Sequence, residues 1–272
     1  MTSVPVLPVA ARLPARAGFV LRQAGLLAVA VAVYFLVRSL TIGSVEDAHR
    51  NAGLVVGLER RLGIFVERDL QSRILDLDGA AQVLNAIYIY GHWPVIAAVL
   101  AWLAWRRRDA FVVYRNALLI SGVVGMLIVA TFPVAPPRLM DLGFIDTVTL
   151  HSEAYRVLQP PSFTNQYAAM PSFHVGWDLL AGLALVREGG RRWTRVAGSV
   201  LPLLMVLSVV ATGNHYFLDA VVGDAIVLTS LAVATRWHHR SRGSDVREAA
   251  APRPAAAPAG QGPDRQGVRA AA

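Results

Sequence analysis

The sequence contains neither lysine nor cysteine. All 26 basic residues among its 272 are arginines, which excludes a lysine base, a lysine Schiff base and a lysine phosphate clamp. The lack of cysteine excludes disulfides, thiolate metal sites and a cysteine nucleophile. Charged residues make up only 16% of the chain, against 55% hydrophobic residues. This composition is too apolar for a soluble domain and predicts an integral membrane protein.

The net charge of +8 alone is compatible with a nucleic-acid partner. The arginines, however, lie in short loops between apolar runs and in the two tails, which is the distribution expected of membrane flanks. We therefore expect the bilayer as a partner, and no nucleic acid.

Six apolar runs are predicted to cross the membrane, because each approaches the length of about 20 residues that a bilayer requires. They are residues 19–42, 79–105, 110–132, 171–186, 196–211 and 215–235. Between the first two, residues 46–78 mix charges with apolar residues at helical spacing, which predicts one or two amphipathic helices on the membrane surface. The charges of that segment are interpreted as a solvated face. The predicted fold class is an all-α polytopic membrane protein.

The two ends of the chain differ in composition from this membrane region. Residues 1–17 carry scattered prolines and arginines without helical periodicity, and residues 238–272 are rich in Arg, Ala, Pro and Gly. Neither composition buries a core. We expect a disordered lead, a membrane catalytic domain over 18–237 and a disordered basic tail.

Arginine bias sets the expected orientation. Three regions, 106–108, 187–195 and 236–242, carry clustered arginines and are expected on the cytoplasmic side. Both termini are then cytoplasmic in a multi-pass protein of the cell membrane. Segment 46–78 also contains five arginines, so the assignment depends on the three shorter regions. The long loop after residue 132 faces outward and is interpreted as an ordered cap over an active site.

The stretch from Ala168 to Asp178 begins a predicted helix. Pro171 lacks the amide hydrogen that a first turn leaves unpaired, and Ser172 can bond such an amide. His174 then lies in the opening turn, where the helix dipole favours an anion such as phosphate. The alternative is that Pro171 and Ser172 only cap a helix and that His174 is a satisfied polar residue.

A second histidine, His215, begins the last predicted span, and Asp219 follows four residues later on the same helix face. The carboxylate can hold one imidazole tautomer, which leaves the other nitrogen as a nucleophile or base. His174 can then protonate a departing alkoxide, and Arg138 offers a planar donor to phosphate oxygens. A His-x-x-x-Asp pair is often only structural, and Arg138 can anchor a helix end at lipid headgroups.

Two further polar residues have open roles. Asp178 follows His174 by four residues and either orients it or is a buried hydrogen-bonder. His92 lies at membrane depth in the second predicted span, where polar groups normally face a protein interior. It is either a structural hydrogen-bonder or a site residue.

These motifs resemble a known family. Met-Pro-Ser-Phe-His174 and Gly-Asn-His215-Tyr-Phe-Leu-Asp219 are similar to the second and third signature motifs of the type 2 phosphatidic acid phosphatase superfamily. Tyr167-Ala-Ala-Met-Pro-Ser-Phe-His174-Val-Gly-Trp177 further resembles its inositol phosphorylceramide synthase branch. The resemblance covers residues 130–235 and implies a six-span core. It also implies that His215 is the phosphohistidine nucleophile, Asp219 its orienter and His174 the general acid, with phosphate near Ser172 and no metal or cofactor.

The chain departs from the family pattern where phosphate is held. Superfamily phosphatases usually have lysine and arginine in the first motif and an arginine six residues before the third-motif histidine, where this chain has Val209. Arg138, Arg156 and backbone amides are expected to bind phosphate instead, with Tyr167 and His92 as further candidate substrate contacts. The synthase-like branch also tends to lack those residues, so the departure favours that branch.

The expected function is a lipid phosphatase or phosphotransferase at the outer face, with phosphoinositol transfer to a lipid alcohol as one form. Hydrolysis and transfer stay open. A proton-coupled lipid or solute transporter is the alternative, with His92, His174, His215 and Asp219 as its relay. Clustering of these residues near one face, and the lack of repeated spans, disfavour it. A membrane metal oxidase is disfavoured because its histidine-rich boxes are absent.

Overall fold

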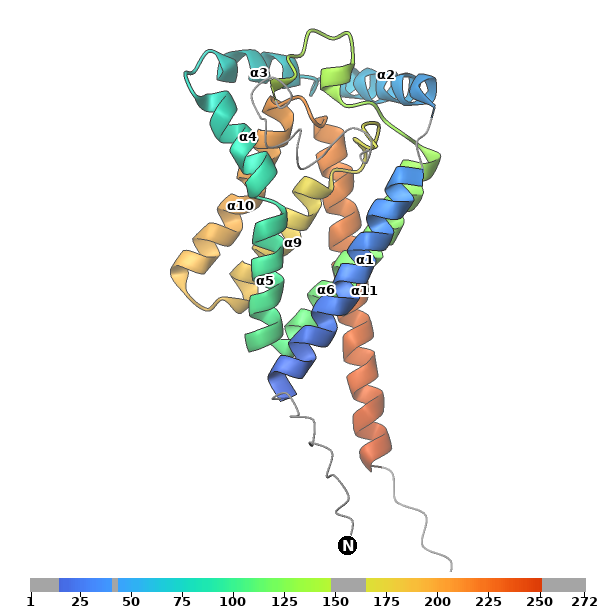
Figure 1. Cartoon of the computed structure of the whole chain (residues 1–272), viewed down its shortest axis with the longest axis vertical. Helices are drawn as coiled ribbons and strands as arrows, with labels where there is room; N and C mark the ends of the chain where they lie inside the picture. Colours follow the sequence, from blue (N-terminus) through green and yellow to red (C-terminus); the bar gives the residue numbers. More distant parts are fainter. Residues whose placement is uncertain (1–14, 41–43, 148–164, 251–272) are drawn as a thin grey trace, which may run out of the picture. The chain divides into compact units, whose positions relative to one another are not determined.

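The computed structural model describes residues 15–40, 44–147 and 165–250. These residues form nine α-helices and one 3-10 turn, and their only β-type pairing is an isolated bridge between Val134 and Ala168. In chain order the elements are α1 (Ala15–Leu40), α2 (Val45–Leu62), α3 (Glu67–Leu75), α4 (Ala80–Tyr90), α5 (Trp93–Arg106), α6 (Arg108–Thr131), the 3-10 turn η1 (Pro137–Leu139), α9 (Phe173–Glu188), α10 (Arg192–Ala211) and α11 (Phe217–Ala250) (Figure 1). The predicted all-α class is confirmed for this part of the chain.

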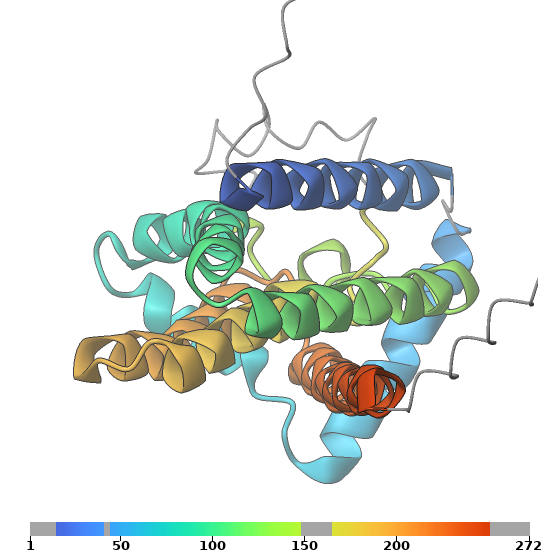
Figure 2. The ribbon, with the colours of Figure 1, turned by 90° about the horizontal axis from the view of Figure 1, so that it is seen from below.

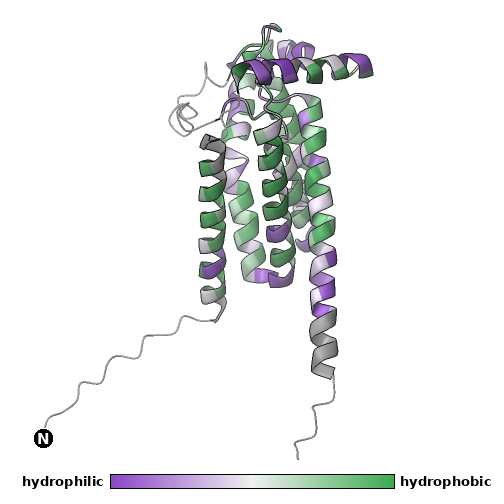
Figure 3. Ribbon diagram, turned by 90° about the vertical axis from the view of Figure 1, so that its right-hand side faces the viewer, coloured by the Kyte–Doolittle hydropathy of each residue, from purple (hydrophilic) through white to green (hydrophobic). Residues whose placement is uncertain are grey.

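Fewer membrane spans are supported than the six predicted. Among the described residues, α6, α10 and the part of α11 from Phe217 to Arg242 are long and apolar enough to cross a bilayer, and α4 with α5 makes a fourth if this bent pair counts as one span. Helix α9 has only 16 residues, and the apolar part of α1 is Ala17–Val33. Hydrophobic residues dominate the upright helices, whereas hydrophilic residues gather on the transverse helix above them and toward their lower ends (Figure 3).

The second predicted span is interrupted. Helix α4 ends at Tyr90, α5 begins at Trp93, and their axes differ by 41°. The cause is Pro94 in the first turn of α5, because its ring has no amide hydrogen and would clash with the carbonyl four residues earlier. His92 lies at this break, which places a polar side chain at the junction of two helices.

The two histidine-bearing helices begin later than predicted. Helix α9 starts at Phe173 rather than Pro171, because Ser172 has an extended N-cap conformation. Helix α11 starts at Phe217 rather than His215. The preceding turn passes through Gly213 with φ +69°, a conformation that favours glycine. His174 therefore lies in a first helical turn as predicted, while His215 lies in the turn before its helix.

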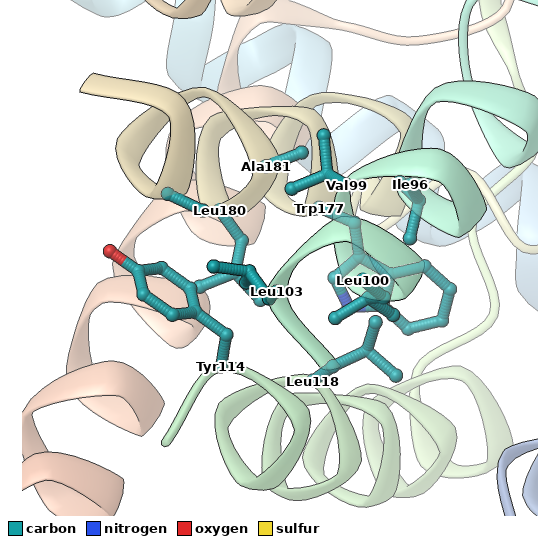
Figure 4. A pocket seen from close by; sticks show the side chains of 10 residues that line it. Ile96, Val99, Leu100, Leu103, Tyr114, Leu118, Trp177, Leu180 and Ala181 are labelled. Carbon is teal, nitrogen blue, oxygen red and sulfur yellow. The ribbon is translucent and has the colours of Figure 1, made fainter. Parts of the chain in front are cut away.

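An apolar core joins the upright helices. Buried side chains of α5, α6, α9 and α11 form one cluster that includes Leu103, Phe111, Trp177 and Val227. Figure 2 shows α6 between α1 and α11 in the view from below. A small pocket lined by Ile96, Val99, Leu103, Leu118, Trp177 and Leu180, among others, lies between α5, α6 and α9 (Figure 4).

Segment 46–78, predicted to form one or two amphipathic helices, forms two, α2 and α3, at the upper end of the bundle in Figure 1. Asn51 of α2 donates to the Pro133 carbonyl at 2.9 Å, and Gln71 of α3 donates to the Ala211 carbonyl at 2.9 Å. Leu54, Leu58 and Leu62 on the other face of α2 stay exposed. The helix pair therefore binds the ends of α6 and α10 through polar contacts.

The chain divides into two units, residues 1–238 and residues 239–272. Every feature described below lies in the first unit. Helix α11 continues to Ala250, beyond the predicted end of the sixth span near Thr235.

Candidate active site at the starts of two helices

The starts of α9 and α11 are in direct backbone contact. The Ser172 amide donates to the Asp219 carbonyl at 2.9 Å. Gly223 approaches so closely that a Cβ atom there would lie 2.3 Å from the Ser172 oxygen, and a Cβ on Gly176 would lie 2.9 Å from the Gly223 oxygen. Two glycines thus permit the close approach that brings the two histidine-bearing segments together.

His215 is 6% exposed, and its Nδ1 atom has two oxygen neighbours. The Ala169 carbonyl lies 2.7 Å from Nδ1, and Asp219 Oδ2 lies 3.5 Å from it. Because a carbonyl only accepts hydrogen bonds, Nδ1 carries the hydrogen and donates it. The neutral imidazole then has its lone pair on Nε2, as a nucleophile or base requires. Ala169 was not anticipated from the sequence, since a backbone acceptor leaves no signature in residue type.

His174 lies among three other rings. Its ring stacks on that of Tyr88 with centroids 4.4 Å apart, and the His92 ring is also 4.4 Å away. The His215 ring centroid lies 5.8 Å from that of His174. The structure therefore brings His92, His174 and His215 into one cluster, although they come from the α4–α5 break, α9 and the turn before α11.

Asp178 pairs with His92. Its Oδ1 atom lies 3.0 Å from His92 Nδ1, and both side chains are buried. The Trp177 ring is parallel to that of His92 at 6.0 Å. Helical spacing suggested that Asp178 can orient His174, but the break between α4 and α5 brings the imidazole of His92 to this carboxylate instead. The cluster thus contains two His–Asp pairs, His92 with Asp178 and His215 with Asp219.

Carboxylates from three elements bind the amide hydrogens at the start of α11. The three bonds are Tyr216 N–H to Asp219 Oδ2 at 2.9 Å, Phe217 N–H to Glu67 Oε1 at 3.1 Å and Leu218 N–H to Glu59 Oε1 at 2.8 Å. Negative groups are favourable at this positive end of a helix. The interpretation of segment 46–78 charges as a solvated face is wrong for Glu59 and Glu67, which are both 0% exposed. The spacing of Glu59 from Ala52 and Val56 on the buried face of α2 was the available signal.

Arg138 is held beside the His215 turn. Its Nη1 atom donates to Asn214 Oδ1 at 2.6 Å, its Nε atom lies 3.4 Å from Asp146 Oδ2, and its backbone amide donates to the Gly213 carbonyl at 2.9 Å. The side chain is 8% exposed. These contacts hold the guanidinium beside Asn214, the residue that precedes His215. The guanidinium is therefore a candidate cation for a phosphate group.

Of the remaining predicted substrate contacts, the structure describes Ser172 and Tyr167. Ser172 is fully buried at the N-cap of α9, and its hydroxyl neither caps the helix nor has another hydrogen-bond partner in the described structure. Tyr167 accepts the Val134 amide at 2.8 Å through its carbonyl, and its ring lies 6.0 Å from that of His49. Arg156 lies outside the described residues.

The Val209 position explains one departure from the family pattern. Its side chain is fully buried in an apolar cluster with Tyr88, Val175 and Met205. Its carbonyl accepts the backbone amides of Asn214 at 2.9 Å and His215 at 3.2 Å. An arginine here would bring a charge into apolar surroundings, so the position supports the His215 turn through its backbone alone.

Comparison with known proteins identifies the family of the chain. The family model described as PAP2 superfamily matches residues 54–233, which include the four helices and turns that carry the histidine cluster. No curated protein and no solved structure gives a match. The match does not favour the transporter alternative. The chain belongs to the PAP2 superfamily, whose members are phosphatases and phosphotransferases.

Proposed function

We propose that this membrane protein cleaves or transfers a lipid phosphoester through a phosphohistidine intermediate on His215. The observation that carries the proposal is the Nδ1 contact of 2.7 Å with the Ala169 carbonyl. This contact assigns the lone pair of the neutral ring to Nε2. Asp219, at 3.5 Å from the same Nδ1, stabilises the positive charge that the ring gains when Nε2 forms a bond.

In the first step, Nε2 of His215 attacks phosphorus and the bond from phosphorus to the leaving alcohol oxygen breaks. His174, with its ring 5.8 Å from that of His215, gives its proton to the departing alkoxide. In the second step, water or an acceptor alcohol gives a proton to His174 while its oxygen attacks phosphorus. The phosphorus–nitrogen bond then breaks, and both histidines return to their initial protonation states. Water gives hydrolysis, and a lipid alcohol gives transfer.

Binding of the phosphate group is assigned to the start of α9 and its neighbours. Ser172 contributes a hydroxyl without a protein partner at the positive end of α9. Arg138 contributes a guanidinium from the other side of the His215 turn. Arg156 and Tyr167 are proposed as further substrate contacts on the loop before α9. Arg138 is a described cation beside the histidines, and the chain has no lysine. A phosphate site without lysine resembles the inositol phosphorylceramide synthase branch more than the lysine-containing phosphatases. This resemblance favours transfer of a phosphorylated headgroup such as phosphoinositol to a lipid alcohol.

His92 is proposed to act beside His174. Its imidazole contacts the ring of His174 on one side and hydrogen-bonds Asp178 on the other. A buried His–Asp pair in this place holds the ring of the general acid and borders the leaving group. His92 is therefore a positioning residue that also lines the substrate site.

The chemistry is proposed at the outer face of the cell membrane, with both termini cytoplasmic. The end of α5 and the α9–α10 turn line one cavity of about 500 Å³, and Arg106, Arg107 and Arg191 are among its lining residues. Helix α9 leads from this cavity to the histidine cluster, and its 16 residues span about 24 Å. Because clustered arginines mark the cytoplasmic side, this separation supports an outward-facing site.

Purified protein in the presence of a chelator tests the proposed function. We expect phosphate release from a lipid phosphate, or headgroup exchange between a phospholipid and a lipid alcohol, and loss of either activity in His215→Ala. A folded wild-type protein that catalyses neither reaction across phosphatidic acid, phosphatidylinositol and ceramide-containing vesicles would overturn the proposal.

Single cysteines test the orientation, because the chain has none of its own. Asp141→Cys lies on the exposed part of the loop before α9, and Arg192→Cys lies at the start of α10. A membrane-impermeant thiol reagent should label the first and spare the second in intact cells. The reverse pattern would place the site in the cytoplasm.

A further inference from the structure

Two buried acids, Glu59 and Glu67, have no role in the reaction proposed above. Glu59 lies on α2 and Glu67 is the first residue of α3, and both are 0% exposed. Charged side chains are almost never fully buried without a partner. Each uses one oxygen, Oε1, to accept a backbone amide of α11. The second oxygen of each, Oε2, is buried and has no donor in the described structure.

The groups that face Glu59 are acidic or neutral. Glu67 of α3 and Asp219 of α11 are close enough to act on it electrostatically, and both raise its pKa. The buried hydroxyl of Tyr216 lies within electrostatic range of the same three carboxyl groups. No salt bridge joins Glu59 or Glu67 to an arginine or histidine anywhere in the described ranges. Ionising both glutamates would therefore place two negative charges without a cationic side-chain partner beside Asp219 in a buried site.

We propose that Glu59 and Glu67 share one proton between their Oε2 atoms and, as a pair, position the start of α11 so that His215 and Asp219 face the phosphate site. The inference rests on the proposed function for the roles of His215 and Asp219. One proton satisfies both unpaired oxygens at once, because the protonated carboxyl donates and the ionised one accepts. The single remaining negative charge lies at the positive end of the α11 dipole.

The pair also limits the negative charge around Asp219. Carboxylates gathered in one buried cluster repel one another. When the glutamate pair holds the proton, one negative charge fewer lies beside Asp219 and its contact with His215. Since Glu59 and Glu67 belong to α2 and α3, these two surface helices determine the geometry of the nucleophile without contacting the substrate.

A dependence of stability on pH follows from the shared proton. Burial, followed by the hydrogen bond with Glu67, raises the pKa of Glu59 to about 9 from an ordinary value of 4.5. Between these two values the folded protein holds a proton that the unfolded chain has released. The contribution of this proton to the free energy of unfolding is therefore complete below the lower pKa, declines as pH rises, and is lost above the higher pKa.

The test uses isosteric amides in the full-length protein. Glu59→Gln, Glu67→Gln and the double variant are compared with wild type and with Glu46→Gln, an exposed acid of the same helix α2. Thermal unfolding and phosphoester turnover are measured from about pH 6 to about pH 9.5, the range in which the shared proton is lost. In each single variant the amide supplies the donor that the proton supplied. Turnover near neutral pH should stay within about threefold of wild type, because the hydrogen bond is kept.

Two signatures distinguish a shared proton from simple packing. The decrease of the unfolding temperature with rising pH should be reduced in Glu59→Gln and unchanged in Glu46→Gln. The double variant, in which two amide donors face each other, should lose about tenfold or more in turnover although each single variant is tolerated. The inference would be overturned if the unfolding temperature of Glu59→Gln decreased with pH as much as that of wild type. It would also be overturned if the loss of turnover in the double variant were no larger than the product of the two single losses.

Failure of the inference and failure of the proposed function give different results. The unfolding measurement requires no substrate, so its two slopes test proton sharing even in a protein that turns over no phosphoester. Active wild type with identical slopes in wild type and Glu59→Gln would refute the shared proton and leave the proposed function intact.

Discussion

The starts of α9 and α11 each present a histidine at the same end of the helix bundle, but their amide hydrogens have different partners. Carboxyl groups of Asp219, Glu67 and Glu59 bind the amides of residues 216–218. At α9, Ser172 occupies the N-cap position and makes no side-chain cap bond. Acidic side chains thus bind the amides at the start of α11, while among the described residues no acid caps the start of α9.

This difference assigns separate tasks to the two helix starts. Acids at the start of α11 repel a phosphate group but stabilise the positive charge that His215 gains as a nucleophile. The start of α9 has the opposite property, because its dipole and the hydroxyl of Ser172 favour a negative ligand. The two histidines are therefore not interchangeable, even though their rings lie 5.8 Å apart. His215 is the proposed nucleophile, and His174 is the proposed acid beside the bound phosphate.

The largest effect that distinguishes the two starts is expected from His174→Ala. Turnover of an alkyl phosphoester should fall by about 10²–10⁴-fold, because the leaving alkoxide loses its proton donor. An activated aryl phosphate departs without a proton, so its reaction with the variant should be nearly normal. Parallel kinetics on the two substrates provide the measurement. Equal losses on both would show that His174 does more than protonate the leaving group.

Asp219→Asn is expected to have a smaller effect. The Ala169 carbonyl also holds the Nδ1 hydrogen of His215, at 2.7 Å, so the correct tautomer persists without the carboxylate. The loss should be about 10²-fold, below the roughly 10⁴-fold seen where an aspartate alone sets the tautomer. Turnover of the purified variant, with its unfolding temperature as a check on the fold, gives the comparison. A loss as large as that of His215→Ala would contradict the role assigned to Ala169.

Gly223→Ala should separate the two helix starts. Its new Cβ atom would meet the backbone oxygen of Ser172 at 2.3 Å, and a backbone atom cannot rotate away. We expect a loss of about 1–3 kcal/mol in stability from the forced displacement, together with reduced turnover. Gly53→Ala is the matched control, because that helical glycine has no atom within 4 Å of its Cβ position. Similar unfolding temperatures for the two variants would contradict close contact between α9 and α11.

Ser172→Ala gives the smallest expected effect. The hydroxyl has no hydrogen-bond partner in the described structure, so its removal should not lower the unfolding temperature. If the hydroxyl contacts phosphate, kcat/KM should fall by about threefold to tenfold, the value of one hydrogen bond. Reduced stability with unchanged kinetics would instead indicate a structural role for Ser172.

The motifs in the sequence predicted the histidine cluster better than its surroundings. Local spacing placed His174 in a helix start and Asp219 near His215, because such relations depend only on helix geometry. The break between α4 and α5 was also readable from Gly91 and Pro94, although the apolar run concealed it. Periodicity alone therefore overestimated the continuity of the helices.

The contacts that the sequence did not predict are long-range. The bond of His92 to Asp178 joins residues 86 positions apart, and the bond of Glu59 to the Leu218 amide joins residues 159 apart. No local pattern encodes such distances. The Ala169 contact uses a backbone carbonyl, which any residue type provides. These contacts depend on how the helices pack, and only the folded chain shows them.

The position of the phosphate on the trapped enzyme tests the central claim most directly. Rapid quenching during turnover, followed by mass spectrometry and by NMR of the isolated peptide, identifies both the histidine and the ring nitrogen that carries phosphorus. Our account predicts an acid-labile, base-stable phosphate on Nε2 of His215 in wild type and none in His215→Ala. Phosphate on Nδ1 of His215, on His174, or equally trapped in both proteins would contradict it.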